Sequence, residues 1–192
     1  MLCPGSRSGA LAMAAGGLAS FGRLRVFTAI DERSAAFFAV GISNSFGRAC
    51  AVITTSGTAV ANLLPAAVEA DRSSIPLLLI TADRPYRLKN CGANQTLNQE
   101  DFLLPVCRFY LDGPKDGIHS CDAKYLTKLV DIAWEKAHHL KGPVHLNIAF
   151  EEPLHPSSQE QKEIWNQWQV NCLEKIKVTN LLQERNFVEK SL

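Results

Sequence analysis

The stretch CAVITTSGTAVANLLPAAVEADRSSIPLLLITADRP, residues 50–85, decides the fold. It starts with an apolar run at 50–55, turns at Ser56-Gly57, continues as an alanine-rich helix over 58–70 and ends in an apolar strand at 75–81. Both predicted strands are almost continuously apolar, whereas a strand with one solvated face alternates apolar and polar residues. The stretch therefore predicts a strand–helix–strand unit whose parallel strands are covered on both faces.

The same alternation extends in both directions along the chain. Before the central stretch, the pattern predicts helices over 9–20 and 33–45 and a strand over 24–30. After it, the pattern predicts strands over 106–111 and 144–150 and a strongly amphipathic helix over 125–140. Because strand–turn–helix units repeat about every 25 residues, the expected fold class is α/β, a three-layer doubly wound parallel sheet.

Composition excludes several classes of protein. The chain has 192 residues, of which 46% are hydrophobic and 20% charged, and its net charge is +1. These values argue against disorder and against binding to nucleic acid, and no apolar run approaches the roughly 20 residues that span a membrane. The six cysteines form no CxxC pair and the five histidines show no metal-ligand spacing, so we expect no metal site in this chain and a reducing compartment.

A domain boundary is predicted near residues 151–153, where the strand–turn–helix rhythm stops. We expect residues 1–154 to form one domain and residues 155–192 to form a linker, partly helical, into a further domain. Ile164, Trp165, Trp168 and Cys172 would form one helical stripe. Such a stripe packs either on a partner or back on the same domain, and the sequence leaves both open.

Four polar clusters follow predicted strands, and ligands bind at the carboxyl ends of strands in open α/β sheets. The clusters are 4–8, 31–33, 54–58 and 83–85. In the first, Gly5 permits a tight turn, Ser6 or Ser8 would cap a helix, and Arg7 would grip a carboxylate. The alternative is plain helix capping with a solvated Arg7, and the local pattern does not decide between them.

Glu32 and the 54–58 cluster also have two interpretations each. Glu32 lies between an apolar strand and an apolar helix, so a partly desolvated carboxyl there would share a proton with a basic ligand nitrogen. The alternative, which spacing alone favours, is a first-turn glutamate stabilised by the helix dipole. Residues 54–58 contain no GxSxG elbow and no Walker lysine, so they form either a ligand-facing turn or a capped helix start. No GxGxxG follows a strand, which argues against dinucleotide binding.

Five motifs in order resemble one family. They are PGSRS at 4–8, IDER at 30–33, TSGTAVANL at 55–63, LITADRP at 79–85 and CGANQT at 91–96. Together they resemble the N-terminal pyrimidine-binding domain of the 2-succinyl-5-enolpyruvyl-6-hydroxy-3-cyclohexene-1-carboxylate synthases, thiamine-diphosphate enzymes of menaquinone and phylloquinone biosynthesis. The likeness covers residues 3 to about 154, and residues 31–37 look most like the plant and algal forms.

The resemblance implies roles for individual residues. The glutamate matching Glu32 hydrogen-bonds N1′ of the cofactor's aminopyrimidine ring and is the catalytic residue of this domain. The positions that match substrate-contacting residues are Ser6, Arg7, Arg84, Asn94 and Gln95, and the positions that border the cofactor are Thr55, Ser56, Gly57 and Thr58. The implied substrates are 2-oxoglutarate and isochorismate, and the implied cofactors are thiamine diphosphate and Mg²⁺ or Mn²⁺.

This chain departs from the family pattern in three places. The family has a helix and a full first strand before the PGSR motif, where this chain has Met1-Leu2-Cys3. Tyr86-Arg87 stands where proline and an acidic residue are usual. The family's diphosphate-binding domain, which holds the metal ion, is also missing, so we expect a fragment that is inactive alone.

Two functions from different classes remain. The first is the pyrimidine-domain portion of such a synthase, working as a homodimer or higher oligomer in the plastid of a plant or alga, or otherwise in the cytoplasm. The second is a catalytically inactive remnant that acts as an interaction or regulatory module. A remnant has no need to keep Glu32, Arg7, Arg84, Asn94 and Gln95 together, and their joint presence favours the enzyme.

Overall fold

A computed structural model describes residues 1–167 and shows a four-stranded sheet in which every pairing is parallel. The strand order is β1-β2-β4-β3, and the strands are β1 (Cys50–Thr54), β2 (Leu77–Asp83), β3 (Phe109–Asp112) and β4 (Pro143–Ala149). The two central strands, β2 and β4, are buried along nearly their whole length. The predicted parallel α/β sheet is confirmed, with each strand boundary within a few residues of the expected one.

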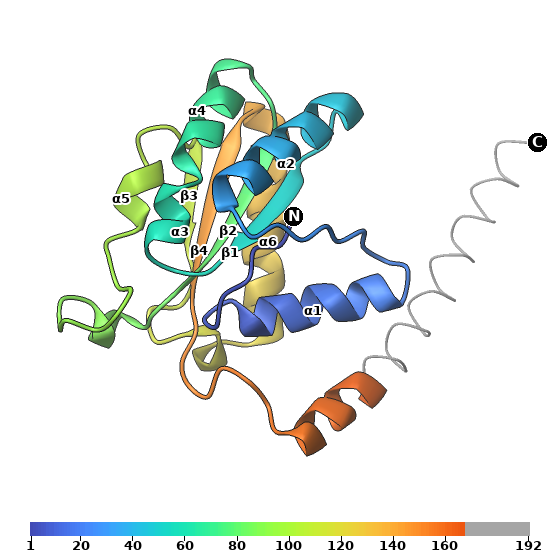
Figure 1. Cartoon of the computed structure of the whole chain (residues 1–192), viewed down its shortest axis with the longest axis vertical. Coiled ribbons are helices and arrows are strands. Elements are labelled where there is room, and N and C mark those ends of the chain that lie inside the picture. The colour runs from blue at the N-terminus through green and yellow to red at the C-terminus, as the bar shows by residue number, and fades with distance from the viewer. Residues whose placement is uncertain (168–192) are drawn as a thin grey trace, which may run out of the picture. The chain divides into compact units, whose positions relative to one another are not determined.

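Helices cover both faces of the sheet (Figure 1). On one face α2 (Glu32–Phe46) packs on β1 and β2, α4 (Leu64–Arg72) packs on α2 and β4, and α5 (Glu100–Leu103) packs on α4. All three helices contribute to one core that includes Val52, Leu77 and Leu79. On the other face α1 (Gly9–Ser20) and α6 (Ala123–Leu140) pack around Leu78, Val144 and Leu146. Successive residues of β2 therefore serve opposite cores, which explains why the strand is apolar without alternation.

The strand predicted at 24–30 is wrong. The structure has a single bridge there, between Thr28 and Leu2, and Leu2 also bridges Ile53 beside β1. The amide of Leu2 donates to the carbonyl of Phe27 at 2.8 Å. Because no longer segment of the described residues pairs with 24–30, a ladder does not form, and Ile30 stays 87% exposed.

The predicted helix over 58–70 is two helices, α3 (Thr58–Ala61) and α4. Pro65 occupies the first turn of α4, where its missing N–H is tolerated, so the chain restarts a helix at this point. Asn62 caps the carboxyl end of α3. Short 3₁₀ turns, Tyr86–Leu88 (η1) and Ile118–Ser120 (η2), interrupt the connections around β3.

Helix capping differs from the expectation at two of the polar clusters. The Ser8 hydroxyl does not cap α1 but donates to the carbonyl of Gly5 at 3.1 Å. Gly57 precedes α3 and has no side chain to cap it. In contrast, Asp31 caps α2 by accepting from the amide of Ser34 at 2.7 Å.

The chain divides into two compact units, Met1–Leu154 and His155–Leu192. In the second unit, residues 158–167 are helical, and the start is a capping box in which Ser157 and Glu160 exchange hydrogen bonds between side chain and backbone. Trp168 and Cys172 of the predicted stripe lie outside the described residues. Among residues 1–167 no helix is long and apolar enough to cross a membrane.

Candidate functional site

The four polar clusters gather at one edge of the sheet. Thr54 ends β1 and Asp83 ends β2, so residues 54–58 and 83–85 leave the sheet at its carboxyl edge. Residues 4–8 follow Leu2, and residues 31–33 follow Thr28, on the two bridges beside β1. The structure thus brings together segments that are up to about 80 positions apart in the sequence, as parallel strands require.

The first and third clusters touch through a glycine. A Cβ atom placed on Gly5 would lie 2.3 Å from Cβ of Thr55, far inside van der Waals contact. Only a residue without a side chain therefore lets the 4–8 turn lie against the 54–58 turn. Thr55, Ser56 and Gly57 are buried, whereas Thr58 is exposed.

Glu32 is the first residue of α2 and is half-buried at this edge. Its Oε2 accepts a hydrogen bond from Nδ2 of Asn62 at 3.1 Å, and no described residue donates to Oε1. α3 begins in the 54–58 turn and ends at Asn62, so this short helix connects the turn to the carboxylate. Burial, with a smaller contribution from the charge of Glu32, raises the pKa of the neighbouring Cys3 to about 11 and keeps its thiol neutral.

Arg84, Ser56 and Gln95 form the next contact. Nη1 of Arg84 donates to Oγ of Ser56 at 2.6 Å and to the carbonyl of Gln95 at 2.8 Å. Oγ of Ser56 donates to the same carbonyl at 3.2 Å. The structure therefore brings three of the predicted residues together, although Gln95 takes part through its backbone. Its side chain lies against Gly57, where a Cβ would meet Cγ of Gln95 at 2.8 Å.

Arg7 is only 6% exposed, and its guanidinium is held by its own chain. Nη1 donates to the carbonyl of Phe150 at 2.9 Å, and Nη2 lies 3.1 Å from Oε1 of Glu152. Nε is buried without a hydrogen-bond partner among the described residues. Burial, together with the positive charge of Arg7, lowers the pKa of Arg84.

Two predicted residues lie at the rim of the site. Ser6 and Asn94 are exposed, and the carbonyl of Ser6 accepts from the amide of Gly9 at 3.0 Å. Asn94 belongs to the segment between η1 and α5, one position before the residue that meets Arg84 and Gly57. The structure places both side chains facing solvent at the same edge.

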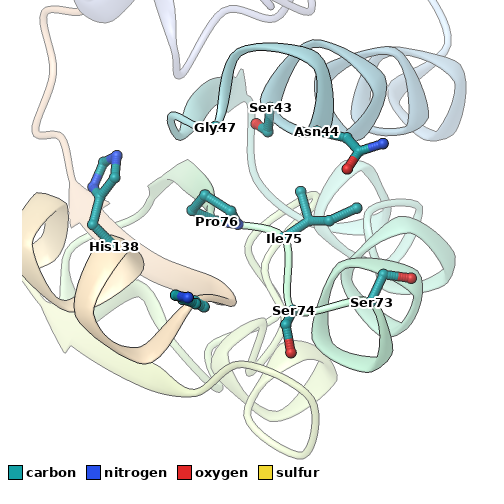
Figure 2. Close-up of a pocket in the computed structure, with 9 residues that line it drawn as sticks. Ser43, Asn44, Gly47, Ser73, Ser74, Ile75, Pro76 and His138 are labelled. Carbon is teal, nitrogen blue, oxygen red and sulfur yellow. The ribbon is translucent and has the colours of Figure 1, made fainter.

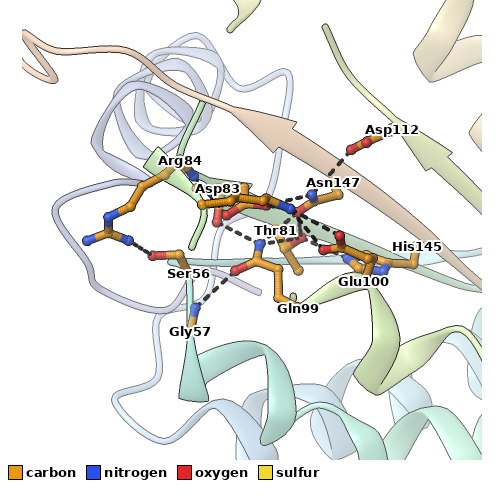
Figure 3. A network of polar contacts seen from close by, with 12 residues as sticks. Ser56, Gly57, Thr81, Asp83, Arg84, Gln99, Glu100, Asp112, His145 and Asn147 are labelled. Carbon is orange, nitrogen blue, oxygen red and sulfur yellow. Dashed lines mark hydrogen bonds and ion pairs between the residues drawn. The ribbon is translucent and has the colours of Figure 1, made fainter. Parts of the chain in front are cut away.

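A buried polar network beside the site was missed by the sequence analysis (Figure 3). It joins the Gln99 carboxamide to the ends of β2, β3 and β4 through Thr81, Asn147, Asp83 and Asp112. His145 and Asn147 stand two positions apart inside an apolar strand and so share one face. This spacing is the sequence signal that predicts a buried polar layer.

The opposite edge of the sheet carries a pocket of about 280 Å³ (Figure 2). It lies before β1, β2 and β4 begin, and its lining residues are Ser43, Asn44, Gly47, Ser73, Ser74, Ile75, Pro76, His138 and Lys141. None of the predicted site residues lines it. Within residues 1–167 no group of three or more His, Cys, Asp and Glu side chains is arranged to hold a metal ion.

Comparison with known proteins shows the family to which the chain belongs. Residues 2–102 match the family described as "Thiamine pyrophosphate enzyme, N-terminal TPP binding domain". The chain is also similar to proteins named 2-succinyl-5-enolpyruvyl-6-hydroxy-3-cyclohexene-1-carboxylate synthase. It is 65% identical over 168 residues to that of Prochlorococcus marinus (strain MIT 9313), which covers 88% of this chain and 29% of the relative. It is 66% identical over 169 residues to that of Synechococcus sp. (strain WH7803), again 88% and 29%. The chain thus spans less than a third of the length of these curated relatives.

Proposed function

The chain belongs to the thiamine pyrophosphate enzymes through their N-terminal TPP-binding domain, and from this premise we propose what it does. It forms the pyrimidine-binding part of a synthase that decarboxylates 2-oxoglutarate and adds the remaining succinyl unit to isochorismate. The names of its relatives describe a succinyl and enolpyruvyl cyclohexene carboxylate as the product, which supports this pair of substrates. The domain in question is residues 1–154, and residues 155–192 lead toward a further domain.

The placement of Glu32 carries the proposal. Its carboxylate is half-buried at the carboxyl edge, one oxygen is oriented by Asn62, and the other has no donor among residues 1–167. A carboxyl group in this situation is suited to hold a proton against a ring nitrogen of the cofactor. When bound, thiamine diphosphate would supply a nucleophilic carbon toward the 2-oxo acid and a cationic ring to accept the electron pair released with carbon dioxide.

The other predicted site residues at this edge would bind and orient the cofactor and the substrates. The buried turn of Thr55, Ser56 and Gly57, with Thr58 at its rim, would border the aminopyrimidine ring. Arg7 and Arg84 would hold substrate carboxylates, since a guanidinium fork matches a carboxylate. The exposed side chains of Ser6, Asn94 and Gln95 would supply neutral hydrogen bonds around them.

A second copy of the chain would complete the site. Ile30, Phe37 and Phe38 flank Glu32 and are 87%, 44% and 54% exposed, which is apolar surface suited to burial in an interface. We infer a homodimer or higher oligomer, with Mg²⁺ or Mn²⁺ and the diphosphate held by a domain outside residues 1–167. The compartment would be the plastid in a plant or alga and the cytoplasm in a bacterium, where the free cysteines of the described residues stay reduced.

The test is a hybrid enzyme. The matched region of this chain replaces its counterpart in the Synechococcus relative, and isochorismate consumption is measured with and without 2-oxoglutarate and thiamine diphosphate. We expect turnover that depends on both compounds. Glu32→Gln in the hybrid should slow it by about 10²–10⁴-fold, the usual effect of losing a positioned acid–base group.

A control separates chemistry from folding. Glu69→Gln makes the same change at an exposed site on α4 and should leave turnover unchanged. A folded hybrid without turnover would instead favour the inactive remnant. Equal rates for Glu32→Gln and the parent would show that Glu32 is only a helix-start carboxylate.

A further inference from the structure

One polar layer crosses the whole sheet just before the carboxyl edge. Thr54, Thr81, Asn147 and Asp112 lie at matching register positions on β1, β2, β4 and β3. Residues at matching positions of parallel strands point to the same face, which here is the face covered by α2, α4 and α5. The layer therefore lies between the apolar core and the candidate site.

Gln99 joins this layer to the turn at the site, and its side chain is fully buried. Its Oε1 accepts from the backbone amide of Gly57 at 3.0 Å. Its Nε2 donates to Oδ1 of Asn147 at 2.7 Å and to the carbonyl of Ala82 at 3.0 Å. One side chain thus ties the 54–58 turn to both central strands (Figure 3).

On the side away from Gly57, the polar groups of the network also have hydrogen-bond or ion-pair partners. Nδ2 of Asn147 donates to Asp83 at 2.9 Å and to Asp112 at 3.3 Å. Lys89 lies 3.0 Å from Oδ2 of Asp83 and 3.0 Å from Oε2 of Glu100. Burial acts to lower the pKa of Lys89, but the hydrogen bonds to Glu100 and Asp83 outweigh it and raise the pKa. Because an unpaired polar group is costly here, each member fixes the orientation of the next.

The 54–58 turn has two further contacts with the 91–98 segment: Oγ of Ser56 donates to the carbonyl of Gln95, and Gln95 also lies against Gly57. This segment is mostly exposed. The bond from Gly57 to Gln99 is buried and so is not weakened by competing water. Gly57 itself has φ of 78° and ψ of −133°, a conformation that glycine adopts freely and that needs an external contact to be selected.

We propose that Gln99 is a positioning residue, which holds the 54–58 turn in the conformation that receives the aminopyrimidine ring. The proposal rests on the proposed function for the identity of the ring. The fixing of the turn itself depends only on the contacts of Gln99. Gln99 acts through Gly57 and the layer behind it and does not touch the ligand.

The experiment uses the full 192-residue chain and amide hydrogen exchange followed by NMR. Gln99→Met fills the space without donors or acceptors, and Gln161→Met makes the same change at an exposed position of the second unit. In Gln99→Met the Gly57 amide should exchange at least about fivefold faster, while Val52 and Ile80 amides in the strands keep their rates. In Gln161→Met all these rates should equal those of the parent.

Two results would overturn the positioning role. One is an unchanged Gly57 rate, and the other is an equal acceleration of Gly57 and of the strand amides, which would make Gln99 a general core residue. If Gln99→Met does not fold, the hydrogen bond is tested in the parent chain instead. We expect a scalar coupling across this bond, between the Gly57 nitrogen and the Gln99 carboxamide carbon. Its absence would sink the proposal.

A separate titration tests the proposed function. The probe is 4-amino-2,5-dimethylpyrimidine at millimolar concentration, and the readout is the shift of the Glu32 and Thr58 amides. We expect shifts in the parent chain and a several-fold weaker affinity in Gln99→Met. No shift in the parent would count against the proposed ring site, whatever the Gly57 exchange shows. Equal affinity in both chains would overturn the positioning role.

Discussion

Asn62 donates from Nδ2 to Oε2 of Glu32 across 3.1 Å, and the two residues are thirty positions apart. Asn62 follows Ala61 at the carboxyl end of α3, and its backbone keeps right-handed helical angles there. This hydrogen bond gives the candidate acid–base residue a neighbour that orients one of its carboxylate oxygens.

Removing this neighbour should impair the reaction without abolishing it. In the hybrid enzyme, Asn62→Ala should lower kcat/KM by roughly three- to tenfold, the effect of one hydrogen bond on an accessible carboxylate. Steady-state kinetics measure it. Asn44→Ala, on the opposite edge of the sheet, serves as the control. A loss as large as that of Glu32→Gln would mean that Asn62 itself contacts the reacting groups.

Gly5 should tolerate no side chain. Gly5→Ala forces a Cβ to within 2.3 Å of Thr55 and should lower the free energy of unfolding by about 1–3 kcal/mol, as overpacking does. Gly16→Ala in the middle of α1 meets nothing within 4 Å and should stabilise the chain by about 0.5–1 kcal/mol. Urea denaturation of both variants checks the pair. Equal effects would show that the turn moves freely away from Thr55.

Arg7 should matter for stability before any ligand binds. Arg7→Ala leaves the carbonyl of Phe150 without its donor and should cost about 1–3 kcal/mol. Glu152→Gln keeps a hydrogen-bond acceptor beside Nη2, and because Glu152 is exposed it should cost less than about 1 kcal/mol. Arg72→Ala, at an 81% exposed side chain, is the matched control. If Arg7→Ala and this control have the same free energy of unfolding in urea, the guanidinium of Arg7 does not stabilise the fold.

His145 should make the stability depend on pH. Burial lowers the pKa of His145 to about 3, so between about pH 6.5 and 3 the unfolded chain binds a proton that the folded chain does not. The contribution of neutral His145 to the free energy of unfolding is complete above pH 6.5. It is lost progressively as the pH falls toward 3, at no more than about 1.4 kcal/mol per pH unit.

Urea denaturation at pH 7 and pH 5 tests this prediction. The readout is the difference between the free energies of unfolding at the two pH values. His145→Gln should show a smaller difference than the parent, since glutamine still reaches Thr81 but does not titrate. His139→Gln, at an exposed position of α6, should match the parent. An identical difference in all three chains would contradict the assignment.

The sequence by itself determined the alternation of strands and helices. It also determined that polar residues follow the strands and that the sheet is parallel, because hydrophobic periodicity and turn residues act locally. From the parallel sheet alone it follows that residues 4–8, 31–33, 54–58 and 83–85 meet at one edge. The five motifs then identified the family.

Only the tertiary structure decided which partner each polar side chain finds. It directed Arg7 inward to Phe150 and Glu152, joined Gln99 to Gly57 and Asn147, and left residues 24–30 without a ladder. Each of these outcomes depends on strand register and on groups that lie far apart in the sequence, and no local pattern records them. A buried donor or acceptor must be satisfied by whatever the packed neighbours offer, so its partner is fixed only when the whole core is assembled.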